Sequence, residues 1–413
     1  MMSNDLLSAN QYGFVSGRSC VSQLVDVFDD WTKAWDAGNG VDVIYTDFMK
    51  AFDKVPHERL LVKLKSYGIV GDVLEWIRQF LMNRRQRVCV EGNFSDWADI
   101  ASGIPQGSVL GPILFLVYIN DLPSCVTDCR VKIFADDTKL YKEIQSESDC
   151  SVLQSNIENI YEWSRKWQLR FHPDKCHVLR IGCSHPEFCY SMLDSEGKHQ
   201  SLEVVTSEKD LGVIVDSDLV FREHVSQIVK KANCTLGIIR RSFRFLDRAT
   251  IMLLYKALVR PVLEYGLPAW SPFYTREIEA IESVQRRATK LVPGLSELPY
   301  EERLRNLNLF SLTHRRLRGD IFFMYKYFNG LITTDHRLFE LVPVGSVTRG
   351  HTYKIVKSRF KTSLRQKFFT QRSIDHWNTL PDEVVTSPTL DIFKSRLDTH
   401  WKKLPGLFNY KLC

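Results

Sequence analysis

The 413-residue chain has no long apolar run, and this absence excludes a membrane-spanning protein. Its best apolar segment, Ile113 to Ile119, is far shorter than the roughly 20 residues that a membrane span needs. The opening MMSNDLLSANQ has no basic end followed by an apolar core, so it does not resemble a secretory signal. We therefore expect a soluble, intracellular protein with no membrane partner. Internal repeats and low-complexity tracts are also missing, which favours ordinary globular domains.

Paired cysteines are missing as well. The ten cysteines occur singly, without CxxC pairs and without the Cys/His spacing of a zinc knuckle. A chain of this length can build its core without covalent staples. We therefore expect reduced thiols and no disulfide framework.

Charge is ordinary in amount but uneven along the chain. Residues 1–219 carry 22 Lys and Arg against 32 Asp and Glu, residues 220–330 carry 19 against 10, and residues 331–413 carry 14 against 7. A carboxylate-rich region suits metal ions and nucleotides, while a basic region suits a phosphate backbone. Solvated helix faces that carry extra Lys and Arg explain the basic half about as well.

The first half of the sequence alternates strand and helix patterns. The β-branched run Val41 to Tyr45 predicts a strand just before Asp47. Two hairpins are expected: one pairs residues 87–90 with 97–100, and the other pairs 131–134 with 138–141 around the turn Ala135-Asp136-Asp137. Helical apolar spacing predicts helices at 57–68, 72–82 and 150–169, and a further strand is expected in KCHVLRIG.

The second half changes to long helices. Residues 220–243, 247–265 and 275–292 show three-to-four-residue apolar spacing with basic residues between, which predicts a helical bundle. The loop LPAWSPFY separates the last two. A basic stretch at 349–372 is expected to be part strand and part helix.

Two acidic positions suggest metal chemistry. Asp47 follows a predicted strand, and Asp136-Asp137 form the turn of a predicted hairpin. Carboxylates gathered at strand ends need a cation between them, and Mg²⁺ prefers oxygen ligands that substrate phosphates can complete. Two such ions roughly 4 Å apart support phosphoryl transfer. Asp is also common in turns for structural reasons, so the Asp-Asp turn alone does not decide.

Several motifs in register resemble those of one family. TDFMKAFDKVPH, SGIPQGSVLGPILFLVYINDLP and FADDTKLY resemble the motifs of reverse transcriptases, most closely those of jockey-like, non-LTR (LINE-type) retrotransposons. Further segments of these enzymes are similar to QYGFVSGRSC, FHPDKCHVLRIG, KDLGVIVDSDL and RSIDHWNTLPDEVV. The resemblance covers nearly the whole chain.

The resemblance implies roles for individual residues of a catalytic centre. Asp47 and Asp136 would bind two Mg²⁺ ions, or Mn²⁺ in their place, helped by the backbone carbonyl of Phe48. Asp137 would be the second acid of the turn and tune the site. Phe52 would be an aromatic gate whose ring collides with a 2′-hydroxyl, which favours deoxynucleotides. Plain core packing is the other explanation of this phenylalanine.

The resemblance also implies substrate contacts outside the acids. Gln106 and Gly107, in the loop Gly103 to Ser108, would lie beneath the incoming nucleotide and template base, although an ordinary Pro/Gly loop has the same composition. Lys175 would be a proton donor near the pyrophosphate, or else a solvated lysine. Leu211-Gly212 resembles the primer grip. A phosphate track, or an ordinary charged surface, would comprise Lys230, Lys231, Arg240, Arg241 and Arg244.

The expected fold is α+β, a right-hand polymerase. Residues 1–215 would form partial fingers and a palm with an antiparallel sheet, 216–292 a helical thumb, and 293–413 a mainly helical basic region. The implied activity is an RNA-directed DNA polymerase that joins a dNTP to a primer 3′-hydroxyl, with an RNA template and a DNA primer as partners, in the nucleus, the cytoplasm or both. The sequence leaves the oligomeric state open.

The start of the sequence suggests a second interpretation. Elements of this kind carry an endonuclease and further fingers motifs ahead of the QYGF segment, and we expect both to be lacking here. The alternative function is therefore a truncated, catalytically inactive retroelement product that only binds nucleic acid through its basic half.

Overall fold

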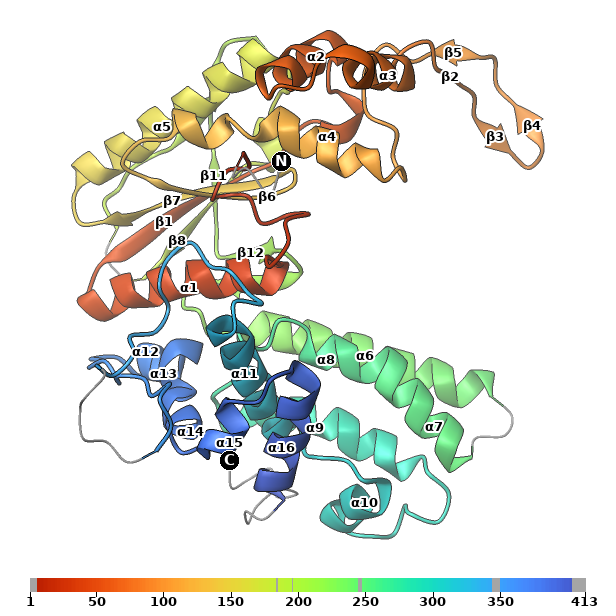
Figure 1. Ribbon diagram of the computed structural model, residues 1–413, viewed down its shortest axis with the longest axis vertical. Coiled ribbons are helices and arrows are strands. Elements are labelled where there is room, and N and C mark those ends of the chain that lie inside the picture. Colours follow the sequence, from red (N-terminus) through yellow and green to blue (C-terminus); the bar gives the residue numbers. More distant parts are fainter. Residues whose placement is uncertain (1–5, 183–184, 195, 244–246, 344–349, 403–413) are drawn as a thin grey trace. The chain divides into compact units, whose positions relative to one another are not determined.

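The computed structural model describes residues 6–182, 185–194, 196–243, 247–343 and 350–402 (Figure 1). The chain forms two compact units: unit 1 comprises residues 1–20 and 38–206, and unit 2 comprises residues 21–37 and 207–413. Helix α1 (Cys20–Ala37) thus belongs almost entirely to the unit formed by the C-terminal half. The division into fingers with palm, thumb and C-terminal region remains a prediction.

Unit 1 is built on a five-stranded sheet with the strand order β11-β8-β1-β7-β6. Strand β1 pairs antiparallel with both β7 and β8, and only β11 runs parallel to its neighbour. The strands are β1 (Gly40–Thr46), β6 (Arg130–Phe134), β7 (Asp137–Ile144), β8 (His177–Ile181) and β11 (Glu203–Val205). The expected α+β class with a largely antiparallel sheet is confirmed.

Helices cover one face of this sheet and form the core of unit 1 (Figure 1). Ile44 and Leu140 of the sheet belong to the same buried cluster as Phe115 and Ile157 of the helices. A capping box of Ser146 and Asp149 starts the longest of them, α5. The helices of unit 1 are α2 (His57–Ser66), α3 (Gly71–Leu81), α4 (Leu110–Ile119) and α5 (Glu147–Trp167), close to the predicted ranges where a helix was predicted.

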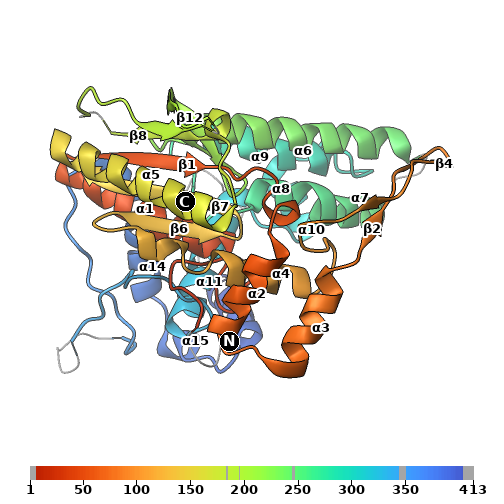
Figure 2. The same ribbon diagram turned by 90° about the horizontal axis from the view of Figure 1, so that it is seen from above.

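A narrow β-ribbon extends from unit 1 beyond α3 (Figure 2). Its strands are β2 (Arg85–Gln86) paired with β5 (Ala98–Asp99), and β3 (Cys89–Val90) paired with β4 (Asn93–Phe94). The expected hairpin exists, but its register was wrong, because the turn is only Glu91-Gly92, both with positive φ. A two-residue turn of this kind brings the returning strand back at Asn93 rather than at Trp97.

Unit 2 is mostly helical, and its second segment begins with a short hairpin of β12 (Ser207–Asp210) and β13 (Val213–Asp216). Its principal helices are α1, α6 (Arg222–Ser242), α9 (Thr275–Lys290), α10 (Tyr300–Leu307) and α11 (Leu312–Phe328). Shorter helices follow at α12 (Ser363–Lys367), α13 (Phe369–Arg372), α14 (Ile374–Asn378), α15 (Asp382–Val385) and α16 (Leu390–Trp401). In the described part of the chain, no helix is both long and apolar enough to cross a membrane.

The single helix expected at 247–265 is interrupted. It consists of α7 (Arg248–Leu254), a π-helix (η5, Tyr255–Val259) and α8 (Arg260–Glu264). Pro261 lacks an N–H and its ring crowds the preceding turn, so the helical hydrogen bonds cannot continue regularly past it. The apolar spacing survives the interruption, which is why the sequence pattern did not reveal it.

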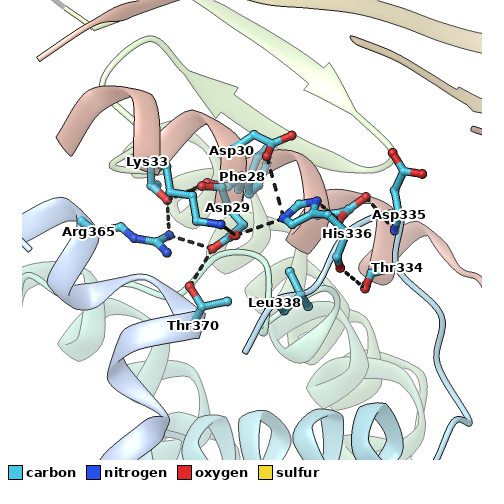
Figure 3. A network of polar contacts seen from close by, with 12 residues as sticks. Phe28, Asp29, Asp30, Lys33, Thr334, Asp335, His336, Leu338, Arg365 and Thr370 are labelled. Carbon is cyan, nitrogen blue, oxygen red and sulfur yellow. Dashed lines mark hydrogen bonds and ion pairs between the residues drawn. The ribbon is translucent and has the colours of Figure 1, made fainter. Parts of the chain in front are cut away.

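A buried polar network fastens α1 to the C-terminal part of unit 2 (Figure 3). The carboxylate of Asp29 is fully buried, and its oxygens contact His336, Arg365 and the hydroxyl of Thr370. Part of the basic C-terminal charge therefore neutralises acids inside the protein.

Candidate active site

The end of strand β1 brings two acids together. Thr46, the last residue of β1, pairs with Thr138 of β7, and its hydroxyl donates a hydrogen bond to the Thr138 carbonyl at 3.0 Å. Asp47 follows this pair, and Asp136 lies in the turn that precedes β7 at the same end. Burial raises the pKa of the Asp136 carboxyl, and the charge of Asp47 raises it further. The structure therefore places the two carboxylates within electrostatic reach of each other.

The turn that carries Asp136 has a constrained backbone. Ala135 adopts the left-handed conformation, with φ of 57°, and Phe134 pairs with Asp137 across the turn. Asp137 is the first residue of β7 and is exposed, whereas Asp136 is half-buried. The two neighbouring acids thus lie in different environments, and the charge of Asp47 acts on the half-buried Asp136.

The segment that precedes β8 contacts Asp47. The N–H of His172 donates to the carbonyl of Asp47 at 2.8 Å, and the short helix η4 (Pro173–Lys175) follows at once. This chain path places the Lys175 ammonium 3.5 Å from the Asp47 carboxylate, with both side chains open to solvent. Sequence spacing alone could not show this contact, because it joins residues 128 positions apart.

Phe48 is held by the same segment. Its ring is buried and stacks on Phe171 at 4.3 Å between centroids. The backbone bridge between Phe48 and Phe171 consists of hydrogen bonds made by the N–H of Met49 and the carbonyl of Asp47. The carbonyl of Phe48 takes no part in these two hydrogen bonds. The backbone oxygen expected to assist metal binding is thus not consumed by this pairing.

The loop at 103–107 is joined to the segment that follows Asp47. The N–H of Ile104 donates to the carbonyl of Phe52 at 2.8 Å, and the side-chain amide of Gln106 donates to the Asp53 carboxylate at 2.9 Å. A Cβ on Gly103 would lie 2.6 Å from the Asp53 carbonyl oxygen, so only glycine permits this approach. The structure thus brings Phe52 and Gln106 to adjacent segments.

The Phe52 ring has a packing partner. It is partly buried and stacks on Phe115 of α4, with 4.3 Å between ring centroids. Gly107 has a φ of 81°, and a Cβ added to it would meet no neighbouring atom of the described residues. These positions are compatible with the nucleotide contacts expected from the sequence.

The Leu211-Gly212 turn belongs to unit 2 and is braced within it. Both residues have positive φ, and the hydroxyl of Tyr265 donates to the Leu211 carbonyl at 2.8 Å. A Cβ on Gly212 would lie 3.2 Å from the Tyr265 ring. The expected strand-turn pattern is therefore present, and Tyr265 is a supporting residue that the sequence did not reveal.

Two sets of basic residues in unit 2 have different surroundings. Lys230, Lys231, Arg240 and Arg241 of α6 are exposed, and within the described ranges no ion pair joins them to an acid. Others neutralise acids of the same unit: ion pairs form between Arg315 and Glu264, Arg318 and Asp398, Arg365 and Asp29, and Arg372 and Asp320. Arg244 lies outside the described residues. Lys230, Lys231, Arg240 and Arg241 are therefore available to meet a phosphate backbone.

The donor set at the acids suits a magnesium ion. Among the residues that the structure describes, no group of three or more His, Cys, Asp or Glu could hold a metal ion. Two carboxylates in mutual repulsion with a nearby backbone carbonyl are nonetheless oxygen ligands, and Mg²⁺ keeps several waters and accepts substrate phosphates to complete its shell. The residues present therefore fit a cation whose coordination shell is completed by substrate phosphates.

Comparisons with known proteins agree with this geometry. Residues 1–215 match the family model described as reverse transcriptase (RNA-dependent DNA polymerase). The chain is 25% identical over 308 residues to the "Probable RNA-directed DNA polymerase from transposon X-element" of Drosophila melanogaster, covering 71% of this chain and 33% of that protein. It is 28% identical over 319 residues to the RNA-directed DNA polymerase from mobile element jockey of Drosophila funebris, covering 72% and 33%.

A solved structure is also similar in part. Apo telomerase from Candida tropicalis superposes with a TM-score of 0.40 and 11% identity, covering 80% of this chain and 50% of that one. The chain spans about a third of the length of the curated relatives named above. The similarity to jockey-like non-LTR elements expected from the motifs is confirmed, and with over half of its length matched, the chain belongs to the reverse transcriptase family.

Proposed function

We propose that this chain is the RNA-directed DNA polymerase of a non-LTR retrotransposon. The observation that carries the proposal is the pairing of Thr46 with Thr138, which places Asp47 beside the turn that holds Asp136. Reverse transcriptases are generally dependent on divalent metal ions. Two acids at one end of a sheet, in a chain of this family, support nucleotidyl transfer from a dNTP to a primer 3′-hydroxyl.

Asp47 and Asp136 are the residues that would hold two Mg²⁺ ions, with the Phe48 carbonyl as a further oxygen ligand and Mn²⁺ as a substitute. When bound, such ions stabilise the charge on the attacking and leaving oxygens. Asp137, which is exposed next to Asp136, adds negative charge that tunes the site. Because Asp136 is half-buried, its carboxyl releases its proton less readily than a free one, and a cation favours the ionised form.

Other residues of unit 1 orient the nucleotide. The Phe52 ring, supported by Phe115, would act as a sugar gate, and Gln106 fixes the loop 103–107 through Asp53. Lys175 is close enough to Asp47 to lie near a bound triphosphate, where its ammonium can give a proton to the leaving pyrophosphate. In this proposal, Gln106 contributes to nucleotide binding, Phe52 selects the sugar, and Lys175 transfers the proton.

Unit 2 supplies the contacts to nucleic acid in this proposal. The braced turn Leu211-Gly212 would seat the primer end, and the unpaired cations of α6 would follow the phosphate backbone of the RNA template and DNA primer. Priming at a chromosomal end would place the reaction in the nucleus.

Primer extension on an RNA template with Mg²⁺ tests the proposal. The chain should extend the primer with dNTPs, and Asp136→Asn should abolish extension. Asp96→Asn, on the exposed ribbon, is the matched control and should leave extension unchanged. Absence of extension from the wild-type chain, with RNA binding retained, would instead support the alternative function, an inactive retroelement product that binds nucleic acid.

A further inference from the structure

Gln11 is a buried residue at the edge of the sheet that carries Asp136. Its side chain is 2% exposed, and the residue forms a parallel bridge with Ile133 of β6. The N–H of Tyr12 donates to the Ile133 carbonyl at 2.8 Å, and the N–H of Ile133 donates to the Asn10 carbonyl at 3.0 Å. The segment around Gln11 therefore lies along β6 just before the Asp136 turn.

The Gln11 side chain reaches into that turn. Its Oε1 accepts hydrogen bonds from the N–H of Gly13 at 2.7 Å and from the N–H of Ala135 at 3.0 Å. Both neighbours are donors, so the amide oxygen and not the nitrogen must face them. Ala135 is the left-handed residue immediately before Asp136. One glutamine oxygen thus fixes the strained residue of the turn.

Two features show how closely the segment fits the turn. A Cβ on Gly13 would lie 2.6 Å from the Ala135 nitrogen, so the approach requires glycine. The Gln11 Nε2 is buried and has no hydrogen-bond partner among the described residues. A buried, unsatisfied donor is destabilising, and an apolar side chain of similar size would avoid it. The presence of a glutamine at this position is therefore explained by the two hydrogen bonds that its side-chain oxygen accepts.

We propose that Gln11 is a positioning residue for catalysis: it holds Ala135 in the left-handed conformation and thereby aims Asp136 at Asp47. An acid on a two-residue turn changes direction when the turn residue before it changes φ and ψ, because that residue sets the path of the backbone. The catalytic part of this inference rests on the proposed function. The effect on the turn does not.

The test compares Gln11→Met, which removes the acceptor but keeps the volume, with Gln11→Glu, which keeps an acceptor oxygen. Gln79→Met, on the exposed face of α3, is the matched control. Three quantities are measured on the full chain: amide hydrogen exchange at Ala135, Mn²⁺ affinity by electron paramagnetic resonance, and kcat and KM for a dNTP in primer extension.

Gln11→Met should raise the exchange rate at Ala135 and weaken Mn²⁺ binding, each by about tenfold, as expected for loss of about one net hydrogen bond. It should lower kcat by about tenfold or more while KM changes less than about threefold. Gln11→Glu should restore protection at Ala135, and Gln79→Met should resemble the wild type. Should Gln11→Met fail to fold, Gly13→Ala displaces the same segment with Gln11 intact and should give the same losses.

The outcomes separate this inference from the proposed function. Unchanged exchange at Ala135 and unchanged Mn²⁺ affinity in Gln11→Met would overturn the positioning role, even if the wild-type chain extends primers. Faster exchange and weaker Mn²⁺ binding in a chain that never extends primers would support the positioning of the turn and reject the polymerase. A fall in kcat that Gln11→Glu fails to rescue, with Ala135 protection unchanged, would also overturn it.

Discussion

The Nε2 atom of His336 lies 3.1 Å from the Oδ2 atom of Asp29, although 307 positions separate the two residues. The other ring nitrogen of His336 lies 2.8 Å from Asp26, which is also fully buried on α1. Figure 3 shows the histidine reaching the same carboxylate that Arg365 and Thr370 contact from α12 and α13. Helix α1 is therefore held to unit 2 by charge as well as by packing.

The stability of unit 2 should depend on pH through this contact. Burial opposes protonation of His336, but hydrogen bonds to Asp26 and Asp29 outweigh it and raise the pKa from 6.5 to about 9. A raised pKa stabilises the folded state fully below pH 6.5, and the gain is lost as the pH rises through 9. The rise corresponds to about 3 kcal/mol at most.

Denaturant unfolding of the wild type and His336→Gln between pH 6 and 10.5 measures this effect. The difference in the free energy of unfolding should be largest near pH 6, should shrink as the pH rises from 6.5 to 9, and should be nearly gone above pH 9. Asp29 contributes in the opposite direction: its burial is outweighed by His336, Arg365 and Lys33, so its pKa is lowered and its contribution is lost at acid pH. A difference between the two proteins that stays constant with pH would contradict this assignment.

The same contact explains what the sequence could and could not predict. The apolar stripe of a helix is usually recognisable, but α1 also buries Asp26 and Asp29, whose partners come from residues 336 and 365. No local pattern indicates such partners, and no helix was predicted there. By contrast, Asp47 and Asp136 follow from strand patterns of a few residues, and an antiparallel pairing of those strands suffices to bring their ends together.

Supporting residues were missed for a similar reason. Gln11, Tyr265 and Asp53 act through hydrogen bonds to backbone or side-chain atoms that lie far away in the sequence. A lone glutamine two residues before a glycine gave no local signal of that role. The register of the ribbon was wrong because the positive φ of Glu91 is rare for a residue of its type, so the tight turn was not expected.

Phe52→Val should admit ribonucleotides, because a smaller side chain no longer collides with the 2′-hydroxyl. The preference for dNTP over rNTP in kcat/KM should fall on the order of 10- to 100-fold. Phe115→Leu is the control: it removes the ring beneath Phe52 but leaves the gate itself in place. Sugar discrimination that changes equally in both variants would assign Phe52 to core packing.

The cations of α6 should dominate the salt dependence of primer-template binding. The double variant of Lys230→Ala and Lys231→Ala should reduce the slope of log Kd against log salt concentration by roughly 0.7 to 0.9 per lysine. The control removes Lys357 and Lys394, which form ion pairs with Asp375 and Asp391. An equal change of slope in both double variants would mean that α6 has no special role.

The two glycines of the loop should respond differently to alanine. Both have positive φ, so each substitution costs about 1 to 2 kcal/mol of backbone strain. Gly103→Ala adds a collision with the Asp53 backbone and should be the more destabilising in thermal unfolding. Gly107→Ala projects into open space, so it should mainly raise KM for the dNTP. An unchanged KM for the dNTP in Gly107→Ala would exclude a nucleotide contact at Gly107.

Lys175 can act in two ways, and two variants separate them. Its ammonium, 3.5 Å from the Asp47 carboxylate, screens negative charge and can also release a proton to pyrophosphate. Arginine keeps the charge but cannot be deprotonated in proteins, while methionine removes both properties. If proton donation matters, Lys175→Arg and Lys175→Met should both lower kcat by about 100-fold or more, as for loss of a general acid.

Single-turnover kinetics at saturating dNTP give the required comparison, because product release then does not mask the chemical step. Mn²⁺ affinity provides the independent readout of charge screening. Lys175→Arg should keep the wild-type affinity, while Lys175→Met should bind Mn²⁺ more tightly, because Asp47 loses its competing cation. Full activity in Lys175→Arg would leave Lys175 with a screening role alone, since a guanidinium beside Asp47 can balance charge without supplying a proton.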